Sequence, residues 1–199
     1  MRTVVVTNIV SLDGYYEGPG GNVMALPMDA AFDAYNRERI ERADTVLLGA
    51  RSYQGFGSYW PSIADAPHDA SDRRRSDDNR ALSRRYNDIE KVVVSDTYRP
   101  PADHPWHDTT TVVPRADIAS WLAEHKSADR GDILVFGSRT MWNGLLAHGL
   151  VDELHLMTGA TVLGGGTPLF ASPIDALHLV DARRFDGSDN VLLVYRPRS

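Results

Sequence analysis

The chain has 199 residues, of which 42% are hydrophobic, and this is enough for one well-filled core. We therefore expect a single domain over residues 1–199. The formal net charge of -6 gives no surface suited to nucleic-acid phosphates, so nucleic acid is not an expected partner. The lack of cysteine excludes disulfides and thiolate metal sites and fits a reducing compartment. No apolar segment has the length of a signal peptide or membrane span, so we predict a cytoplasmic protein without membrane contact.

Strand and helix patterns alternate from the start of the chain. Val4 to Val10 is β-branched and apolar, which predicts a buried strand that ends at Ser11-Leu12-Asp13-Gly14. Tyr15 to Pro27 is rich in glycine and proline and predicts an extended loop. Met28 to Ala43 repeats apolar residues at helical spacing, and Asp29 is placed to favour the N-terminus of that helix.

The alternation continues through the middle of the chain. The expected elements are a strand at Thr45 to Leu48, a helix after Gly49, a polar excursion at Ser62 to Asp88, strands at Lys91 to Ser95 and Thr110 to Val113, and a helix from about Arg115 to Lys126.

The stretch from Ile133 to Leu146 is the most informative. Its apolar run stops at Gly137-Ser138 and an amphipathic pattern starts at once, which predicts a strand, a tight turn and a helix. Gly137 lets the backbone approach a ligand, and Ser138 can cap the new helix and leave its positive dipole end facing outward. These features suit a phosphate. An ordinary strand-to-helix turn without a ligand is the alternative.

The last part of the chain has a different order. Glu153 to Met157 and Thr161 to Leu163 are β-like, and Leu177 to Phe185 with Val191 to Tyr195 predicts a hairpin. The whole order predicts an α/β fold with a mostly parallel twisted sheet flanked by helices and with antiparallel C-terminal strands.

Ligands of such sheets gather at the carboxyl ends of the strands. Gly49, Ser95 and Gly137 are expected at such ends. A Rossmann dehydrogenase would need Gly-x-Gly-x-x-Gly after its first strand, and Ser11-Leu12-Asp13-Gly14 does not match that pattern.

Five motifs, taken in chain order, resemble one family. They are Ser11-Leu12-Asp13-Gly14, Leu48-Gly49-Ala50-Arg51-Ser52-Tyr53, Val94-Ser95, Phe136-Gly137-Ser138, and the run from Leu150-Val151-Asp152-Glu153-Leu154 to Gly164-Gly165-Gly166-Thr167-Pro168-Leu169-Phe170. The set resembles the dihydrofolate-reductase-like superfamily, in the branch of the riboflavin-biosynthesis reductase C-terminal domain. The resemblance covers nearly the whole chain apart from the polar excursion, and it implies that superfamily's fold.

The resemblance also implies a cofactor, NADPH, bound along the strand ends. Gly49 and Ser52 match the family's turn over the pyrophosphate, and Ser95 matches the serine beside the adenosine. Gly137 and Ser138 match a glycine pair at a second phosphate-side helix, whose first residues here are Arg139 and Thr140.

Two departures from the family pattern affect the choice of cofactor. Ala50 stands where the family's turn usually has arginine, although Arg51 is adjacent, and Ser138 replaces a common second glycine. Asp96 follows Ser95, and a carboxylate near the adenosine ribose would accept a 2′-hydroxyl and repel a 2′-phosphate. Arg51 and Arg115 are the candidate partners of a 2′-phosphate. NADH or FMN therefore stays possible beside NADPH.

The candidate catalytic residues are three carboxylates. The resemblance implies an acid at the start of the first helix that holds the substrate and helps to protonate it, and Asp29 and Asp33 are placed there. Asp13 lies at the end of the first strand, where a carboxylate can orient a substrate or a water molecule. The alternatives are a turn aspartate for Asp13 and helix-dipole partners for the other two.

No metal site is expected, because His104 and His107 lack a third ligand nearby. Hydrolase and nucleoside-triphosphatase motifs are also absent from the sequence.

Three functions remain open. The first is an NAD(P)H-dependent reductase of a small heterocyclic substrate, pterin-like or riboflavin-precursor-like. The second is a flavin- or nucleotide-binding protein on the same scaffold without reductase activity. The third is a structural dimer whose site has decayed. A homodimer is expected, partly because the resemblance implies it and partly because the closing strands offer more apolar residues than helices can cover. Those residues are Leu154, Leu156, Val191, Leu193 and Tyr195.

Overall fold

The computed structural model describes residues 1–69, 71–174 and 176–198. The chain divides into two compact units. The first unit contains Met1–Thr3 and Ala34–Ser138, and the second contains Val4–Asp33 and Arg139–Ser199. The expectation of one domain over residues 1–199 stays a prediction. No helix of the described residues is long and apolar enough to span a membrane.

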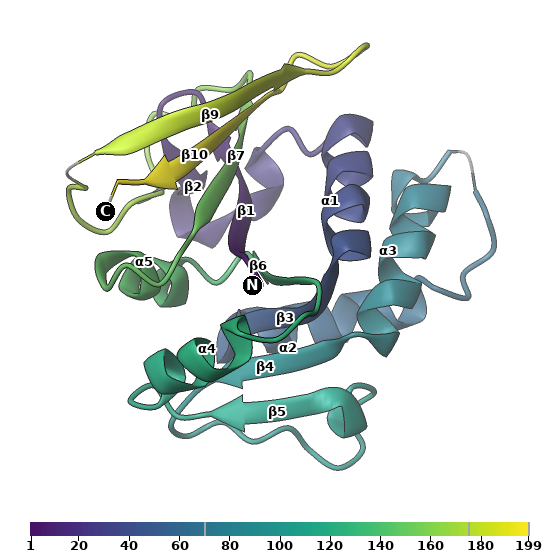
Figure 1. The fold of residues 1–199 in the computed structure, drawn as a ribbon. Coiled ribbons are helices and arrows are strands. Elements are labelled where there is room, and N and C mark those ends of the chain that lie inside the picture. Colours follow the sequence, from purple (N-terminus) through teal and green to yellow (C-terminus); the bar gives the residue numbers. More distant parts are fainter. Residues whose placement is uncertain (70, 175, 199) are drawn as a thin grey trace. The chain divides into compact units, whose positions relative to one another are not determined.

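Helices and strands alternate for most of the described chain (Figure 1). The α-helices are α1 (Ala30–Arg42), α2 (Ala50–Tyr59), α3 (Asp77–Asp88), α4 (Ile118–Lys126) and α5 (Arg139–Ala147). The strands are β1 (Val4–Ser11), β2 (Tyr15–Glu17), β3 (Ala43–Gly49), β4 (Glu90–Val94), β5 (Thr110–Val113), β6 (Asp132–Phe136), β7 (Glu153–Gly159), β8 (Thr167–Pro168), β9 (Leu177–Arg184) and β10 (Val191–Pro197). Short 3-10 helices cover Pro19–Gly21, Val23–Ala25, Trp60–Ser62, Arg73–Arg75 and His107–Thr109.

The first unit is built on four parallel strands in the order β5-β4-β3-β6. The central residues of β3, β4 and β6 are β-branched or leucine and almost fully buried, as in a sheet covered on both faces. Leu47 of β3, for example, lies opposite Val92 of β4, and both are fully buried. Because all four strands run in the same direction, their carboxyl ends lie together.

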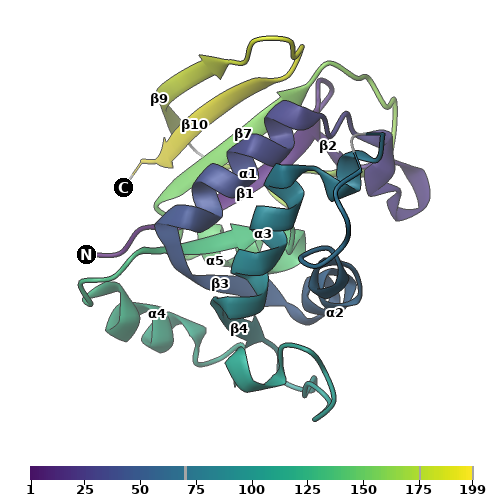
Figure 2. The same cartoon turned by 90° about the vertical axis from the view of Figure 1, so that its right-hand side faces the viewer.

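The second unit combines both kinds of strand pairing. β1 pairs with β7 in parallel, β10 pairs with β7 and β9 in antiparallel fashion, and β2 pairs with β8 in a separate two-stranded sheet. Figure 2 shows β7, β10 and β9 side by side. The predicted hairpin at the C-terminus is therefore confirmed. The predicted fold class is confirmed as well, with mostly parallel pairing, flanking helices and antiparallel C-terminal strands.

Three sequence expectations differ from the structure. Thr161 to Leu163 is not a strand but part of the loop after β7, where Gly164 and Gly166 adopt positive φ. The expected loop from Tyr15 to Pro27 contains β2 and two short 3-10 helices. The polar excursion ends in α3, which buries Leu82 and Tyr86 because its apolar residues share one face.

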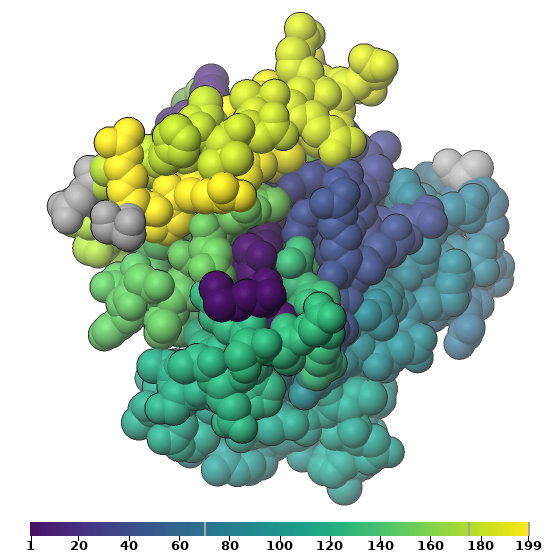
Figure 3. Space-filling view, in the orientation of Figure 1, coloured from purple at the N-terminus to yellow at the C-terminus, as the bar shows by residue number. Residues whose placement is uncertain are grey.

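Part of the apolar surface that was expected to form a dimer on the closing strands is buried. Leu154 and Leu156 of β7 are buried within the chain. The exposed apolar side chains in this region are Leu179 and Val180 of β9. Figure 3 shows the β9 segment at the surface, in yellow-green, as expected for the last strand of its sheet. The homodimer stays a prediction that no longer rests on β7.

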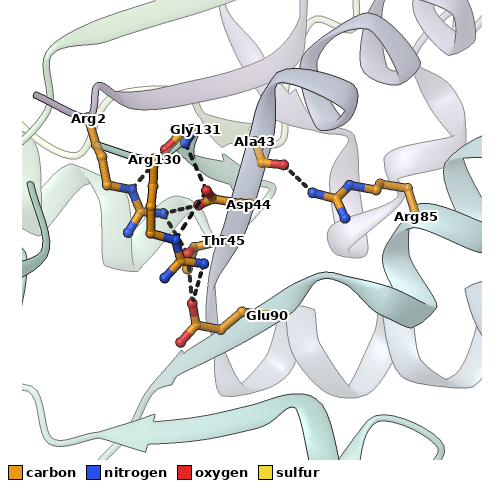
Figure 4. Close-up of polar contacts among 8 residues, drawn as sticks. All are labelled: Arg2, Ala43, Asp44, Thr45, Arg85, Glu90, Arg130 and Gly131. Atoms are coloured by element: carbon orange, nitrogen blue, oxygen red, sulfur yellow. Dashed lines mark hydrogen bonds and ion pairs between the residues drawn. The ribbon is translucent and has the colours of Figure 1, made fainter. Parts of the chain in front are cut away.

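A polar cluster joins the amino ends of the strands in the first unit (Figure 4). Arg2, whose side chain is fully buried, donates to Asp44 at 2.5 Å and to Thr45 at 2.6 Å. Thr45 in turn donates to Glu90 at 3.0 Å. Arg130 reaches the carboxylates of Asp44 and Glu90 at 3.2 and 3.4 Å. We call these five residues the amino-end cluster, and it ties β3, β4 and the segment before β6 to the N-terminus.

A buried lysine lies close to the same end of the sheet. Lys91 is the second residue of β4, and its ammonium donates to the Asn87 carbonyl at 3.1 Å and to the Thr109 hydroxyl at 2.8 Å. It also lies 4.9 Å from the ring centroid of Trp106. Burial lowers the pKa of Lys91 to about 7, since the charged form loses its hydration.

Candidate functional site

The carboxyl ends of the first unit's strands bring together the residues that the sequence pointed to. In the spatial order β5, β4, β3 and β6, the strands are followed or ended by Arg115, Ser95, Gly49 and Gly137. The expectation that these glycines and serines gather at one end of a parallel sheet is confirmed. Ligands of open α/β sheets bind at this end, because loops and helix N-termini meet there.

Two hydrogen bonds join the turns that follow β3 and β6. The N–H of Gly49 donates to the hydroxyl of Ser138 at 3.0 Å, and the N–H of Ser138 donates to the hydroxyl of Ser52 at 3.0 Å. Ser138 is buried, which strengthens both bonds by reducing their contact with water. We call Gly49, Ser52, Gly137 and Ser138 the joined turns.

The joined turns require an unusual backbone. Gly137 has a φ of 57° and Ser138 a φ of 54°, and Ser138 is the one non-glycine residue with positive φ in the described chain. A side chain in this region costs roughly 1 to 2 kcal/mol. The two hydrogen bonds of Ser138 offset that cost. The hydroxyl therefore bonds Gly49 across two strand ends, and its expected role as the cap of the following helix stays a prediction.

The N-terminus of α2 keeps free donors. Gly49 precedes the helix, has no side chain to cap it, and leaves the first-turn amides of α2 without a side-chain acceptor. Arg51 is exposed in that first turn and makes no ion pair with any described residue. Backbone N–H groups, a helix dipole and a guanidinium together suit an anionic group such as a pyrophosphate.

The turn after β4 is fixed by its first residue. The buried hydroxyl of Ser95 accepts hydrogen bonds from the N–H groups of Thr97 and Tyr98 at 3.4 and 3.0 Å. Asp96 then faces the end of β5, where its carboxylate accepts the N–H of Arg115 at 2.9 Å and lies 3.6 Å from the guanidinium. Both side chains are more than half exposed. Asp96 and Arg115, which the sequence presented as opposing influences on a 2′-phosphate, thus pair with each other.

In the second unit, Asp13 connects the end of β1 to the loop after β7. Its carboxylate accepts the Ser11 hydroxyl at 2.7 Å and the N–H groups of Leu163 and Gly164 at 3.0 and 2.7 Å. The hydrogen bond from Ser11, followed by those from the loop, lowers the pKa of Asp13. Asp13 therefore bonds more than its own turn, and its ionised form is favoured. Its catalytic role stays a prediction.

The other two candidate carboxylates lie at the start of α1. One oxygen of Asp29 accepts the N–H of Phe32 at 3.0 Å, which makes Asp29 the N-cap as expected, and the other accepts the Ser188 hydroxyl at 2.5 Å. Asp33, one turn later, is buried. A carboxylate at either position is stabilised by the positive end of the helix.

Arg139 and Thr140 begin α5. The guanidinium of Arg139 donates to the carbonyls of Pro168, Leu169 and Phe170, so it is used to hold that loop. Thr140 is exposed. The proposed contacts of Arg139 and Thr140 with the cofactor stay a prediction. Because the guanidinium of Arg139 is already bonded to the loop, only its backbone could contact the cofactor.

Two structural roles were not found from the sequence. The hydroxyl of Ser11 accepts the N–H of Tyr15 at 2.8 Å while it donates to Asp13, so it shapes the first turn. Gly166 has a φ of 129°, and a Cβ there would meet the backbone of Glu17 and Gly18. The roles of Ser11 and Gly166 depend on turn geometry or on residues that are distant in the chain, so the sequence alone did not indicate them.

Burial raises the pKa of Tyr16, in β2, to about 12, which keeps its hydroxyl a hydrogen-bond donor at neutral pH.

Comparisons with known proteins agree with this arrangement. The family model of the RibD C-terminal domain matches residues 2–192. The uncharacterized protein YyaP of Bacillus subtilis (strain 168) is 28% identical over 196 residues, which cover 98% of this chain and 94% of that protein.

Two solved structures show the same fold. RibD of Acinetobacter baumannii matches with a TM-score of 0.69 and 16% identity over 100% of this chain and 59% of its own. A dihydrofolate reductase from Enterococcus faecalis complexed with NADP(H) matches with a TM-score of 0.59 and 15% identity over 99% of this chain and 97% of its own.

Proposed function

Because the chain belongs to the RibD C-terminal domain family, we propose that it is a reductase that uses a reduced nicotinamide cofactor. Its proposed substrate is a small heterocycle, pterin-like or similar to a riboflavin precursor. The observation that carries the proposal is the set of turns at the carboxyl ends of β3, β4 and β6. They present small and hydroxyl residues at the strand ends where open α/β sheets bind their ligands.

The residues at these turns fit the phosphates of such a cofactor. Gly49, Ala50 and Gly137 carry no bulky side chain, so a ligand can approach the backbone. The uncapped first turn of α2 supplies N–H donors, and Arg51 supplies positive charge. The hydrogen bonds among Gly49, Ser52 and Ser138 fix the two turns before the ligand arrives, which lowers the ordering cost of binding.

When bound, the nicotinamide supplies the hydride. The chain's own task is then to orient the substrate and to move a proton. Asp29 and Asp33 are the carboxylates proposed for this task, because the lowered pKa of Asp13 favours its ionised form and makes it a poor proton donor. We propose that Asp13 acts on the reaction by fixing the loop at Leu163 and Gly164.

A titration of the purified protein with NADH, NADPH and FMN, followed by fluorescence, tests the proposal. Saturable binding of a reduced nicotinamide cofactor, and its oxidation in the presence of a reducible pterin or pyrimidine, is the expected result. Binding of FMN alone would favour the second candidate, a flavin- or nucleotide-binding protein without reductase activity. Binding of none of the three would contradict both.

We also keep the homodimer and a cytoplasmic location as part of this proposal. Light scattering that gives twice the 22.0 kDa mass of the chain at micromolar concentration is the expected result for the dimer. A monomer mass across that range would contradict it.

A further inference from the structure

One feature of the carboxyl-end turns bears on which nicotinamide cofactor is bound, an inference that rests on the proposed function. The first-turn amides of α2 follow β3, and the neighbouring strand β4 ends at Ser95-Asp96. In Rossmann-type sites, an acidic residue near the phosphate turn accepts the 2′-hydroxyl of the adenosine ribose. Asp96 is a carboxylate at the end of the strand beside the phosphate turn in this unit, so it can act on a ribose in the same chemical way.

The position of Asp96 is fixed by two neighbouring contacts. Ser95 is buried and accepts the N–H groups of Thr97 and Tyr98, so the backbone on both sides of Asp96 is constrained. One carboxylate oxygen of Asp96 accepts the N–H of Arg115. The other lies 3.6 Å from the Arg115 guanidinium, and because the side chain is 53% exposed it remains reachable by a ligand.

A ribose diol and a 2′-phosphate meet this pair differently. The diol can donate hydrogen bonds to the carboxylate of Asp96, and such bonds to a charged acceptor are strong. A 2′-phosphate carries about -1.5 to -2 charge at neutral pH and would be repelled by the same carboxylate. The charge of Arg115 is already balanced by Asp96, and the charge of Arg51, in the first turn of α2, is assigned above to the pyrophosphate.

We propose that the Asp96–Arg115 pair, at the ends of β4 and β5, makes this protein select NADH over NADPH. Asp96 accepts hydroxyls of the adenosine ribose at the place where a 2′-phosphate would have to lie. The carboxylate sets the preference, and Arg115 moderates it by masking part of the negative charge.

Equilibrium binding of NADH and NADPH to the full chain at low ionic strength tests the proposal without relying on turnover. We expect NADH to bind at least about tenfold more tightly, a difference that shrinks as added salt screens these exposed charges. Asp96→Asn keeps an oxygen for the Arg115 N–H but removes the charge. This substitution should weaken the binding of NADH and strengthen the binding of NADPH. The ratio of the two dissociation constants should therefore move toward one.

Two further variants serve as comparisons. Arg115→Ala unmasks the carboxylate and should widen the preference for NADH. Glu124→Gln removes the same charge from an exposed position on α4 and should leave the ratio unchanged. A ratio that responds equally to Asp96→Asn and Glu124→Gln would show only a general charge effect and would overturn the proposal.

Adenosine fragments isolate the end of the cofactor in question. 2′,5′-ADP differs from 5′-AMP by the 2′-phosphate alone, and we expect 5′-AMP to be the better competitor of NADH. Equal affinity for NADH and NADPH, or tighter NADPH, would overturn the selectivity while leaving the reductase proposal standing. Binding of neither cofactor would remove the proposed function and this inference with it.

Discussion

The two ends of the parallel sheet in the first unit are built from opposite kinds of residue. At the amino ends, the amino-end cluster places charged side chains in contact with one another, including the fully buried Arg2. At the carboxyl ends, the joined turns use glycines and short hydroxyl side chains, and their hydrogen bonds involve the backbone. Strands β3 and β4 and the segment before β6 thus begin in a network of charges, whereas β3 and β6 end in turns of glycine and hydroxyl residues.

The difference shows how one sheet separates stability from binding. A fully buried charge such as that of Arg2 makes the loss of its partner costly, because the remaining charge is left unpaired. A ligand, in contrast, needs donors that are reachable and already fixed. Substitutions at the amino ends should therefore change the free energy of unfolding, and substitutions at the carboxyl ends should change cofactor affinity.

The largest effect on stability is expected from Asp44→Ala. Arg2 would lose its carboxylate partner while it stays buried, and breaking a buried pair in this way costs about 3 to 5 kcal/mol. In a chain of this size, each kcal/mol lowers the melting temperature by roughly 2 to 4 °C, so calorimetry should show a drop of about 10 °C. Cofactor affinity below the transition should not change.

Arg130→Ala is the matched control for Asp44→Ala. The side chain of Arg130 is 44% exposed, so its two ion pairs contribute roughly 1 kcal/mol or less. Equal melting temperatures for the two variants would contradict the view that the buried arginine makes the amino ends sensitive.

Gly137→Val is expected to change binding most. Valine would have to adopt a φ near 57°, which costs roughly 1 to 2 kcal/mol or more, and its side chain would block the approach of a ligand to the backbone. Titration should show no cofactor binding to the folded variant. Gly149→Val places the same strain at a φ of 67°, where a Cβ has nothing within 4 Å, so it should lose similar stability and still bind cofactor. Retained affinity in folded Gly137→Val would falsify the cofactor site.

Lys91 makes stability at the amino ends depend on pH. Its folded-state pKa is about 7, against roughly 10.4 in an unfolded chain, so between these values the unfolded state holds a proton that the folded state has lost. Stability should therefore rise as the pH is raised from about 7 to 10. Urea unfolding of the parent and of Lys91→Met at pH 7 and 9 measures this, and the parent should gain more than the variant. If the free energy of unfolding changes by the same amount in both proteins between pH 7 and 9, Lys91 does not titrate in this range.

The smallest effect on stability is expected from Asp13→Asn, which extends the comparison to the second unit. The amide has one acceptor oxygen for the three donors that Asp13 now serves, so hydrogen exchange at Leu163 and Gly164 should accelerate. The melting temperature should change by only a few degrees because Asp13 is exposed, while turnover should fall by roughly 10² if the loop is needed for catalysis. If Asp13→Asn shows faster exchange at Leu163 and Gly164 but turns over substrate at the parent's rate, Asp13 has a structural role only.

Asp13 also predicts the behaviour of that loop in acid. Since its folded-state pKa is lowered, its contribution is present above the ordinary pKa of aspartate and is lost as the pH falls through the lower folded value. Exchange at Leu163 in the parent should therefore approach that of Asp13→Asn only below about pH 4.

Much of the fold and of the strand ends was predictable from local patterns. Continuous β-branched runs define buried parallel strands whatever their neighbours are, and a glycine or serine after such a run marks where the strand must turn. The positions of Gly49, Ser95 and Gly137 at the carboxyl ends follow from these two facts alone.

What could not be predicted depends on contacts between distant residues. The bond from Gly49 to Ser138 requires that β3 and β6 be neighbours, which the order of elements in the chain does not reveal. Arg2 is the second residue of the chain, and nothing local indicates that it is buried. The bonds of Asp13 to the loop after β7 could not be predicted, because Leu163 and Gly164 are far from Asp13 in the sequence.

The division of the chain between the two units has a consequence during synthesis. Most of the first unit is one continuous segment, Ala34–Ser138, so its sheet can assemble while the ribosome is still translating. The second unit pairs β1 with β7, and Val5 lies opposite Glu153. The apolar β1 is therefore made long before β7, and such long-range pairing is slow and leaves a strand edge unpaired in the meantime. This strand is thus the segment of the second unit most in need of a chaperone.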